Sequence, residues 1–370
     1  MALKTATGGR VHGPNRAVNT LGIGVKSILT MAADHELKRV FFWLLAAAAG
    51  GGLRCRLRAR KKAGRPLMTI ALSLGLVVLW ILAWQFWPRP FYLGAMALLR
   101  RASGLRTQRV AVSEQEMVYL EGGAGETLVL LHGFGADRDA WPQMVTHLKG
   151  HYRVIAPDLP GFGDSSRVPS ASHTLDAQLA RLATFLQTLG IEKCHLAGNS
   201  MGGYLAAHYA ARHPEQIQSL WLLAPAGVVS AEESELQQLL ARDDNPLLIE
   251  NLAQFSRLID LCFVKTPYTP GAITRVLAAR AVRDCAFHGQ LFADLFGSAV
   301  PLEDVMGTFQ GPTLIMWGDK DRLLHVSGAA VLRALIPHSQ LCILPNVGHV
   351  PMLEVPQTTA LAFLAFQVGA

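Results

Sequence analysis

From residue 110 onward, short apolar runs alternate with longer segments in which apolar residues recur at helical spacing. The later apolar runs are continuous, which is typical of strands buried on both faces of a sheet. This alternation predicts an α/β domain over residues 110–370, with a mostly parallel sheet flanked by helices. The predicted strands are 110–112, 117–120, 127–131, 152–156, 194–197, 220–223, 313–317 and 340–344, and the clearest predicted helices are 174–189, 204–212, 326–335 and 357–366.

The alternation lapses between Pro225 and Gly311. Residues 231–297 have a mostly helical pattern, with turn sequences at Asn245-Pro246 and at 266–270. We therefore predict a helical cap inserted into the α/β domain at about residues 231–297.

A different pattern precedes the α/β domain. Residues 67–87 carry no charged side chain, and Trp80, Trp84 and Trp87 lie toward the end of the segment. A helix of this length rises about 30 Å, the thickness of a bilayer's hydrocarbon core, and Trp is favoured at membrane interfaces. We predict a transmembrane signal anchor at 67–87. The main alternative is a cleaved signal peptide ending near Ala95-Met96-Ala97, but the apolar stretch is longer than such peptides use.

Charge is distributed unevenly along the chain. Residues 1–66 hold 13 Lys/Arg and 2 Asp/Glu, whereas residues 110–370 hold 16 and 25, so the net charge of +7 comes from the N-terminal region. The acidic main domain argues against nucleic-acid binding, and a basic segment before an apolar helix favours a membrane. By the positive-inside rule, the basic residues from Arg54 to Arg65 predict a cytoplasmic N-terminus and a main domain on the periplasmic or extracytoplasmic side.

The segments beside the anchor are less informative. Residues 1–66 predict a basic, flexible leader. The apolar run at 40–52 is short for a membrane span, and its contact with the membrane stays open. Residues 88–109 predict either a linker helix or a segment lying on the bilayer surface, because apolar residues alternate there with Arg.

Neither the cysteines nor the glycine-rich segments indicate a bound metal or cofactor. The five cysteines show no C-x-x-C or other metal-binding spacing. A Cys262–Cys285 disulfide is conceivable in an oxidising compartment, and the sequence does not establish it. The Gly-rich segment 158–166 lacks the dinucleotide-binding and P-loop patterns and predicts a tight loop at the rim of a pocket.

The segment Gly198-Asn199-Ser200-Met201-Gly202-Gly203 follows a predicted strand and precedes a predicted helix. This context turns G-x-S-x-G into a candidate nucleophile elbow, in which a sharp turn leaves no room for side chains beside the Ser. The bare pattern occurs by chance in roughly one chain in ten of this length, so the rest of the chain must support it.

A Ser nucleophile needs a base, and the base needs an orienting carboxylate. In an α/β sheet with such an elbow, the acid and then the His follow the Ser, each after a strand. Predicted strand 313–317 leads into Asp319 and Asp321, and predicted strand 340–344 leads into His349. His349 is the candidate base, and either Asp319 or Asp321 is the candidate acid.

A tetrahedral intermediate also needs donors for its oxyanion. The loop His132-Gly133-Phe134-Gly135 comes directly after predicted strand 127–131. The backbone N–H groups of Phe134 and Met201 are the natural pair of donors. His132 is expected to support this loop rather than act as a base.

With these motifs, residues 110–370 resemble the α/β-hydrolase superfamily, whose pattern places the acid three residues after Gly318, at Asp321. Residues 223–227 and 326–329 resemble a membrane-anchored branch similar to monoacylglycerol lipase, and its bacterial lipase relatives. The motifs that carry the resemblance are 132–135, 158–163, 198–203, 317–321 and 348–349.

The resemblance implies hydrolysis of a lipid ester through an acyl-serine intermediate, without a cofactor. The segment 198–203 is equally similar to C–C bond hydrolases of aromatic degradation, which is the alternative function. Those enzymes are usually soluble, so the predicted anchor favours lipids. A non-catalytic binding protein on this scaffold is less expected, because Ser200, Asp321 and His349 are all present. The sequence gives no indication of the oligomeric state.

Overall fold

The computed structural model describes residues 64–148, 150–297 and 299–369. The predicted leader up to residue 63, including the apolar run at 40–52 and most of the basic segment, lies outside these residues. The chain divides into two units, Met1–Leu76 and Val77–Ala370.

An apolar helix, α3 (Gly64–Phe86), covers most of the predicted anchor, and α4 (Pro88–Ala102) follows it. Among the described residues, no single helix is both long and apolar enough to cross a membrane. The pair Leu72–Phe86 and Pro88–Ala102, bent by 88°, meets the length and composition requirement together.

The second unit contains an eight-stranded sheet in the order β1-β2-β4-β3-β5-β6-β7-β8. Strands β3 to β8 pair in parallel, whereas β2 is antiparallel to both β1 and β4. The strands are β1 (Leu105–Val112), β2 (Gln115–Gly123), β3 (Glu126–Leu131), β4 (Tyr152–Pro157), β5 (Cys194–Ser200), β6 (Ile217–Pro225), β7 (Thr313–Gly318) and β8 (Gln340–Leu344).

Strand β1 begins at Leu105, five residues before the strand predicted at 110. Leu105 is buried, but the other four added residues are polar, and their side chains are exposed at the edge of the sheet. They nevertheless pair with β2, from Leu105 opposite Gly122 onward. An exposed edge strand lacks the apolar run that marks a buried one, which is why the pattern missed its first half.

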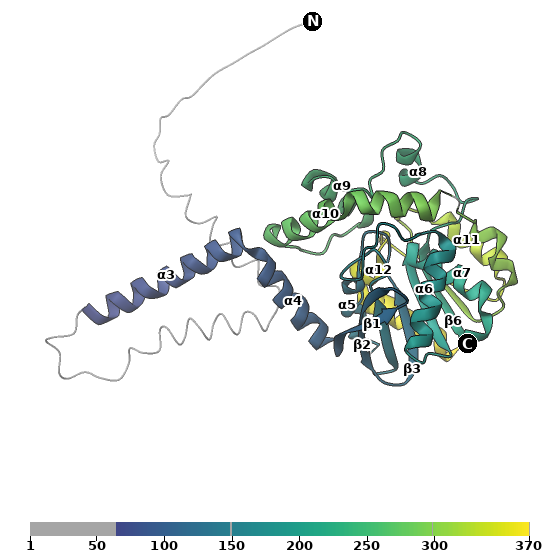
Figure 1. Ribbon diagram of the computed structural model, residues 1–370, viewed down its shortest axis with the longest axis horizontal. Coiled ribbons are helices and arrows are strands. Elements are labelled where there is room, and N and C mark those ends of the chain that lie inside the picture. Colours follow the sequence, from purple (N-terminus) through teal and green to yellow (C-terminus); the bar gives the residue numbers. More distant parts are fainter. Residues whose placement is uncertain (1–63, 149, 298, 370) are drawn as a thin grey trace, which may run out of the picture. The chain divides into compact units, whose positions relative to one another are not determined.

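Helices cover both faces of the sheet, as the alternating pattern predicts (Figure 1). On one face, α6 (Leu175–Thr188), α7 (Met201–Arg212) and α11 (Ser327–Leu335) bury their apolar sides. On the other face lie α5 (Pro142–Val145), α12 (Pro351–Glu354) and α13 (Pro356–Val368). There Phe363 of α13 stacks on Trp221 of β6, with ring centroids 4.4 Å apart. Short 3-10 turns are η2 (Arg138–Ala140), η3 (Pro214–Gln216), η4 (Leu302–Asp304) and η5 (Met306–Thr308).

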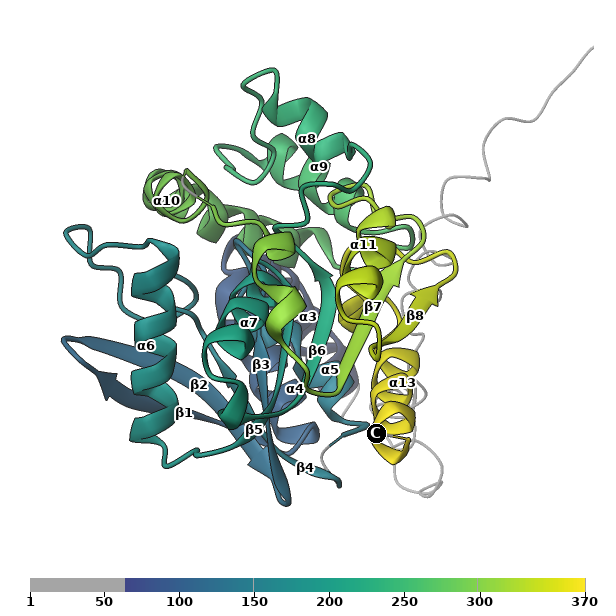
Figure 2. The ribbon, with the colours of Figure 1, turned by 90° about the vertical axis from the view of Figure 1, so that its right-hand side faces the viewer.

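Between β6 and β7 the chain forms α8 (Glu235–Leu240), α9 (Leu252–Cys262) and α10 (Gly271–Phe296). Figure 2 shows these three helices together above the sheet. Ser234 caps the start of α8, where its side chain accepts a hydrogen bond from the Gln237 N–H, and Asn251 caps α9 in the same way through the Gln254 N–H. Pro270 precedes α10. We call α8, α9 and α10 the cap segment. Its Cys262 and Cys285 are free thiols in the structure.

Candidate active site

Ser200 is the last residue of β5, and α7 begins at the next residue, Met201. The Ser200 backbone has φ 55° and ψ −118°, a strained conformation for a residue with a side chain. A Cβ on Gly198 would overlap the carbonyl of Gly202, and one on Gly202 would overlap the carbonyl of Leu131. The glycines of the motif are therefore required by close backbone approach, and the Ser side chain sits on a sharp strand-to-helix turn.

Asp321 and His349 come together at the ends of β7 and β8. The Nδ1 atom of His349 lies 2.7 Å from Oδ2 of Asp321, and their side chains are 5% and 0% exposed. Because a carboxylate only accepts hydrogen bonds, Nδ1 carries the proton and Nε2 is left as an acceptor. This is the tautomer that a general base needs.

Both oxygens of Asp321 have further donors. Oδ1 accepts from the backbone N–H groups of Leu323 and Leu324 at 2.9 and 3.0 Å. Oδ2 also accepts from the indole N–H of Trp317 at 3.1 Å. The carboxylate is therefore held in one orientation in a buried site.

Asp319 has a different place. Its Oδ1 accepts from the backbone N–H of Asn346 at 2.6 Å, and its Oδ2 lies 3.5 Å from the Lys320 ammonium. Its side chain is 30% exposed. Of the two aspartates considered from the sequence, the one that contacts His349 is Asp321.

Two contacts that the sequence did not indicate hold the His349 backbone. The Asn199 amide donates to the carbonyls of His349 and Leu223, both at 3.0 Å. The His349 N–H donates to the carbonyl of Cys262, at the end of α9, at 2.8 Å. Asn199 thus ties the residue beside Ser200 to the His349 loop. The only signal for it in the sequence was a polar residue inside a buried strand.

The 132–135 loop follows β3 and lies against Ser200. A Cβ on Gly133 would come 3.3 Å from the Ser200 Cβ, and Gly135 has φ 71°. The Ala136 N–H donates to the Gly133 carbonyl at 3.2 Å and closes the turn. Met201 is the first residue of α7, so its N–H has no partner within the helix and is available to a ligand.

His132 links this loop to the segment after β4. Its Nδ1 bonds to the Gly133 carbonyl at 2.8 Å, and its Nε2 accepts from the Leu159 N–H at 3.0 Å. Burial lowers the pKa of His132 from 6.5 to about 4, so the ring is neutral at pH 7. With both nitrogens engaged, His132 supports the loop and is not free to act as a base.

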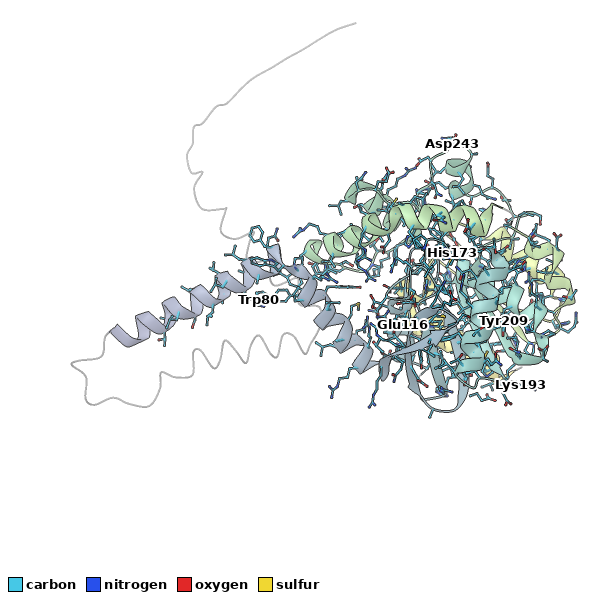
Figure 3. The ribbon with its side chains drawn as sticks, in the orientation of Figure 1. Trp80, Glu116, His173, Lys193, Tyr209 and Asp243 are labelled. Atoms are coloured by element: carbon cyan, nitrogen blue, oxygen red, sulfur yellow. The ribbon has the colours of Figure 1, made fainter. Side chains whose placement is uncertain are left out.

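The cap segment covers this loop. The ring of Phe134 packs against His288 and Phe292 of α10, with centroids 5.6 Å away in each case. His173 lies beneath α10 in Figure 3. Its ring packs edge-on against that of Phe287 in α10, with centroids 5.2 Å apart. The rings of His288 and Phe292 of α10, together with Phe162, therefore surround Phe134. Within the described parts of the chain, no group of three or more His, Cys, Asp or Glu side chains is arranged to hold a metal ion.

The comparison with protein families agrees with this geometry. The family model described as alpha/beta hydrolase fold matches residues 126–264 and 275–356. The chain belongs to this family.

Relatives within the family include lipases. Lipase 1 of Psychrobacter immobilis is 36% identical over 259 residues, which are 69% of this chain and 81% of the lipase. Monoacylglycerol lipase ABHD6 of Bos taurus is 29% identical over 304 residues, 78% of this chain and 90% of that protein. Among solved structures, a membrane phospholipase A described as a novel bacterial virulence factor has a TM-score of 0.76 at 42% identity, covering 83% of this chain and 98% of that one.

Proposed function

We propose that this protein is a serine hydrolase of carboxylic esters that acts through an acyl-serine intermediate. Two observations carry the proposal: the buried Asp321–His349 hydrogen bond of 2.7 Å, and a Ser in a strained strand-to-helix turn whose neighbour, Asn199, donates to the His349 carbonyl. A Ser hydroxyl is a weak nucleophile alone, and this arrangement supplies the base and the group that orients it.

In the proposed mechanism, the Ser200 Oγ attacks the ester carbonyl while Nε2 of His349 takes its proton. Asp321 keeps the imidazole in the required tautomer and stabilises the imidazolium that forms. The N–H groups of Phe134 and Met201 bind the oxyanion. His349 then gives its proton to the leaving alcohol, and water repeats the sequence on the acyl enzyme. Neither a metal nor a cofactor takes part.

We propose a lipid ester as the substrate, in a reaction resembling that of a monoacylglycerol lipase. Support comes from relatives that are named as lipases and monoacylglycerol lipases, and from a solved relative named as a membrane phospholipase A. The aromatic rings of α10 that pack around Phe134 are compatible with an acyl chain.

We further propose that residues 67–87 anchor the protein in a membrane, between a basic leader at 1–66 and a linker at 88–109. The catalytic domain at 110–370, with its cap at about 231–297, would then work at the membrane surface on the periplasmic or extracytoplasmic side. The apolar side chains of α3 support a lipid environment, because Leu72, Leu76 and Leu79 are 60%, 67% and 63% exposed. Trp80 projects from the same helix (Figure 3).

The nucleophile is tested by labelling the full-length protein in detergent with a fluorophosphonate probe. We expect Ser200→Ala to abolish both labelling and ester hydrolysis. Ser256→Ala, at an exposed Ser in α9, serves as the matched control and should retain both. Labelling that persists in Ser200→Ala would disprove the assignment.

The substrate class is tested with monoacylglycerols and p-nitrophenyl esters of graded chain length, with a ring-cleavage dienoate in parallel. We expect hydrolysis of the esters. Activity confined to the dienoate would instead establish the C–C bond hydrolase alternative. The topology is tested by a periplasm-active reporter fused after Gln108, which should be active. A silent reporter would reverse the proposed orientation.

A further inference from the structure

Helix α4 is attached to the α/β domain by its own side chains. Tyr92 of α4 is only 6% exposed. Arg100 makes a two-pronged ion pair with Asp139, with Nε 2.7 Å from Oδ1 and Nη2 2.6 Å from Oδ2. These side chains are 18% and 8% exposed, so the pair is largely shielded from water. Helix α4 is therefore fixed to η2, just after the 132–135 loop.

Arg280 of α10 connects α4 to the same segment. Its Nη1 donates to the Tyr92 hydroxyl oxygen at 3.1 Å, and its Nη2 lies 2.9 Å from Oδ2 of Asp137. The other oxygen of Asp137 accepts from the Asp139 N–H at 2.9 Å and caps η2. One guanidinium on the cap segment thus holds both α4 and the turn that follows the 132–135 loop.

The backbone that follows Phe134 is held by several polar contacts. Asp137 is three residues after Phe134, and the next residue, Arg138, is itself clamped. The Arg138 N–H donates to Oδ1 of Asp158 at 2.8 Å, and its buried guanidinium pairs with Asp158 and Asp164. A displacement of Asp137 should therefore also displace the Phe134 N–H group, because the backbone between the two is short and constrained.

We propose that Arg280 is a positioning residue for ester hydrolysis: by bridging Tyr92 and Asp137, it holds the Phe134 N–H where the oxyanion develops. The inference rests on the function proposed above for Ser200. By this inference, α4, the helix that follows the predicted anchor, helps to position the active site. Displacing a catalytic group by about 1 Å can lower the rate around a hundredfold. A hydrogen bond to the oxyanion stabilises the transition state more than the bound substrate.

The two bonds of Arg280 require the fork of a guanidinium. Lysine keeps the positive charge but has a single ammonium, which does not reproduce two divergent planar donors. Arg280→Lys therefore removes the two divergent donors but keeps the positive charge, whereas Arg280→Gln removes the charge as well. Tyr92→Phe removes only the bond to α4, with little change in volume. The matched control is Arg257→Gln, which breaks an ion pair to Asp244 within the cap segment, 2.7 Å long and exposed.

The kinetic test measures kcat and KM of each full-length variant in detergent with one p-nitrophenyl ester. We expect Arg280→Gln to lower kcat about tenfold with KM changed less than twofold, because the lost interaction acts in the transition state. Arg280→Lys should fall between this variant and the wild type. The control should match the wild type.

A double variant tests the connection to α4. If α4 acts through Arg280, Tyr92→Phe lowers kcat in the wild-type background, by about threefold, and has no further effect in Arg280→Gln. Additive effects would show that the two residues act independently and would contradict the proposed bridge.

Amide hydrogen exchange tests the positioning without relying on activity. We expect amides 133–138 to exchange faster in Arg280→Gln than in the control, at similar melting temperatures. Unchanged exchange, or a rise in KM alone, would overturn the positioning role even if the protein hydrolyses esters. A wild-type protein without esterase activity would overturn the proposed function, and the exchange data would still decide whether Arg280 orders the loop.

Discussion

Asp321 and His349 are 28 residues apart in the sequence, and their side chains meet with His349 Nδ1 2.7 Å from Asp321 Oδ2. The pair is buried, and the carboxylate has three other donors. A buried carboxylate with this many fixed partners is a rigid support for an imidazole, because changing its direction would break several hydrogen bonds at once. The contact gives a direct way to test which aspartate orients His349, the proposed base.

We expect Asp321→Asn to lower kcat by about 10³- to 10⁴-fold, because an amide can donate as well as accept and so favours the wrong tautomer of His349. Asp319→Asn is the matched control, since Asp319 holds the Asn346 N–H and does not contact His349. Its kcat should stay within about threefold of the wild type. Steady-state kinetics on one p-nitrophenyl ester distinguishes the two, and equal losses would contradict the assignment of Asp321.

We expect Asn199→Ala to lower both stability and activity. Asn199 is 2% exposed, and its side-chain amide donates to the carbonyls of His349 and Leu223. Leaving buried carbonyls unpaired costs about 1–3 kcal/mol, and a loosened His349 loop should lower kcat about tenfold. Urea unfolding and steady-state kinetics measure the two effects.

The control for Asn199 is a variant that loses stability away from the site. Thr174→Ala removes the N-cap of α6, which should cost about 1 kcal/mol and leave kcat unchanged. If Asn199→Ala changed stability but not kcat, its role would be limited to packing.

The sequence predicted the elements whose signal is local. Strand β7 was expected within one residue because it is a continuous apolar run buried on both faces. The edge strand β1 was found only in part, because Arg106 and Gln108 face solvent and interrupt its apolar pattern. The motif around Ser200 was recognisable for the same reason as β7, since the elbow needs glycines at fixed short spacing.

The contacts that hold the site were not predictable in this way. Asn199 and His349 are 150 residues apart, and Arg280 lies 143 residues from Asp137. A polar side chain does not indicate its distant partner, and many Arg and Asp residues of the chain were equally available. Only the folded arrangement selects one pair from the rest.

The stability of the protein should depend on pH through His132. Its pKa of about 4 in the folded protein lies below the 6.5 of an unperturbed histidine, mainly because of burial. As pH falls, His132 binds a proton in the unfolded chain before it does so in the folded protein. Its contribution to the free energy of unfolding is therefore fully present above about pH 6.5 and is lost as pH falls toward 4. We expect the His132 contribution to be about 2 kcal/mol smaller at pH 5 than at pH 8.

Urea unfolding at pH 8 and pH 5 checks this expectation. His132→Gln removes the titrating group and should show a smaller loss between the two pH values than the wild type. His338→Gln, at an exposed histidine, should behave like the wild type. If His132→Gln retained the full loss, another group would be responsible.

The last prediction concerns His288, whose ring lies 4.9 Å from Phe162 and 5.6 Å from Phe134. Among the described residues its buried Nε2 has no hydrogen-bond partner, and burial lowers its pKa to about 4. A buried unpaired nitrogen costs about 1–3 kcal/mol, so we expect His288→Phe to raise the free energy of unfolding by about 1 kcal/mol. Urea unfolding at pH 7 measures this, with His338→Phe as the exposed control. Unchanged or lower stability would contradict this expectation and show that the His288 ring, which also bonds to the Gly161 backbone, contributes more than its unpaired Nε2 costs. If His288→Phe were more stable but had a lower kcat/KM, the unpaired Nε2 would be retained for the reaction at the expense of stability. We would then infer that Nε2 hydrogen-bonds to the substrate.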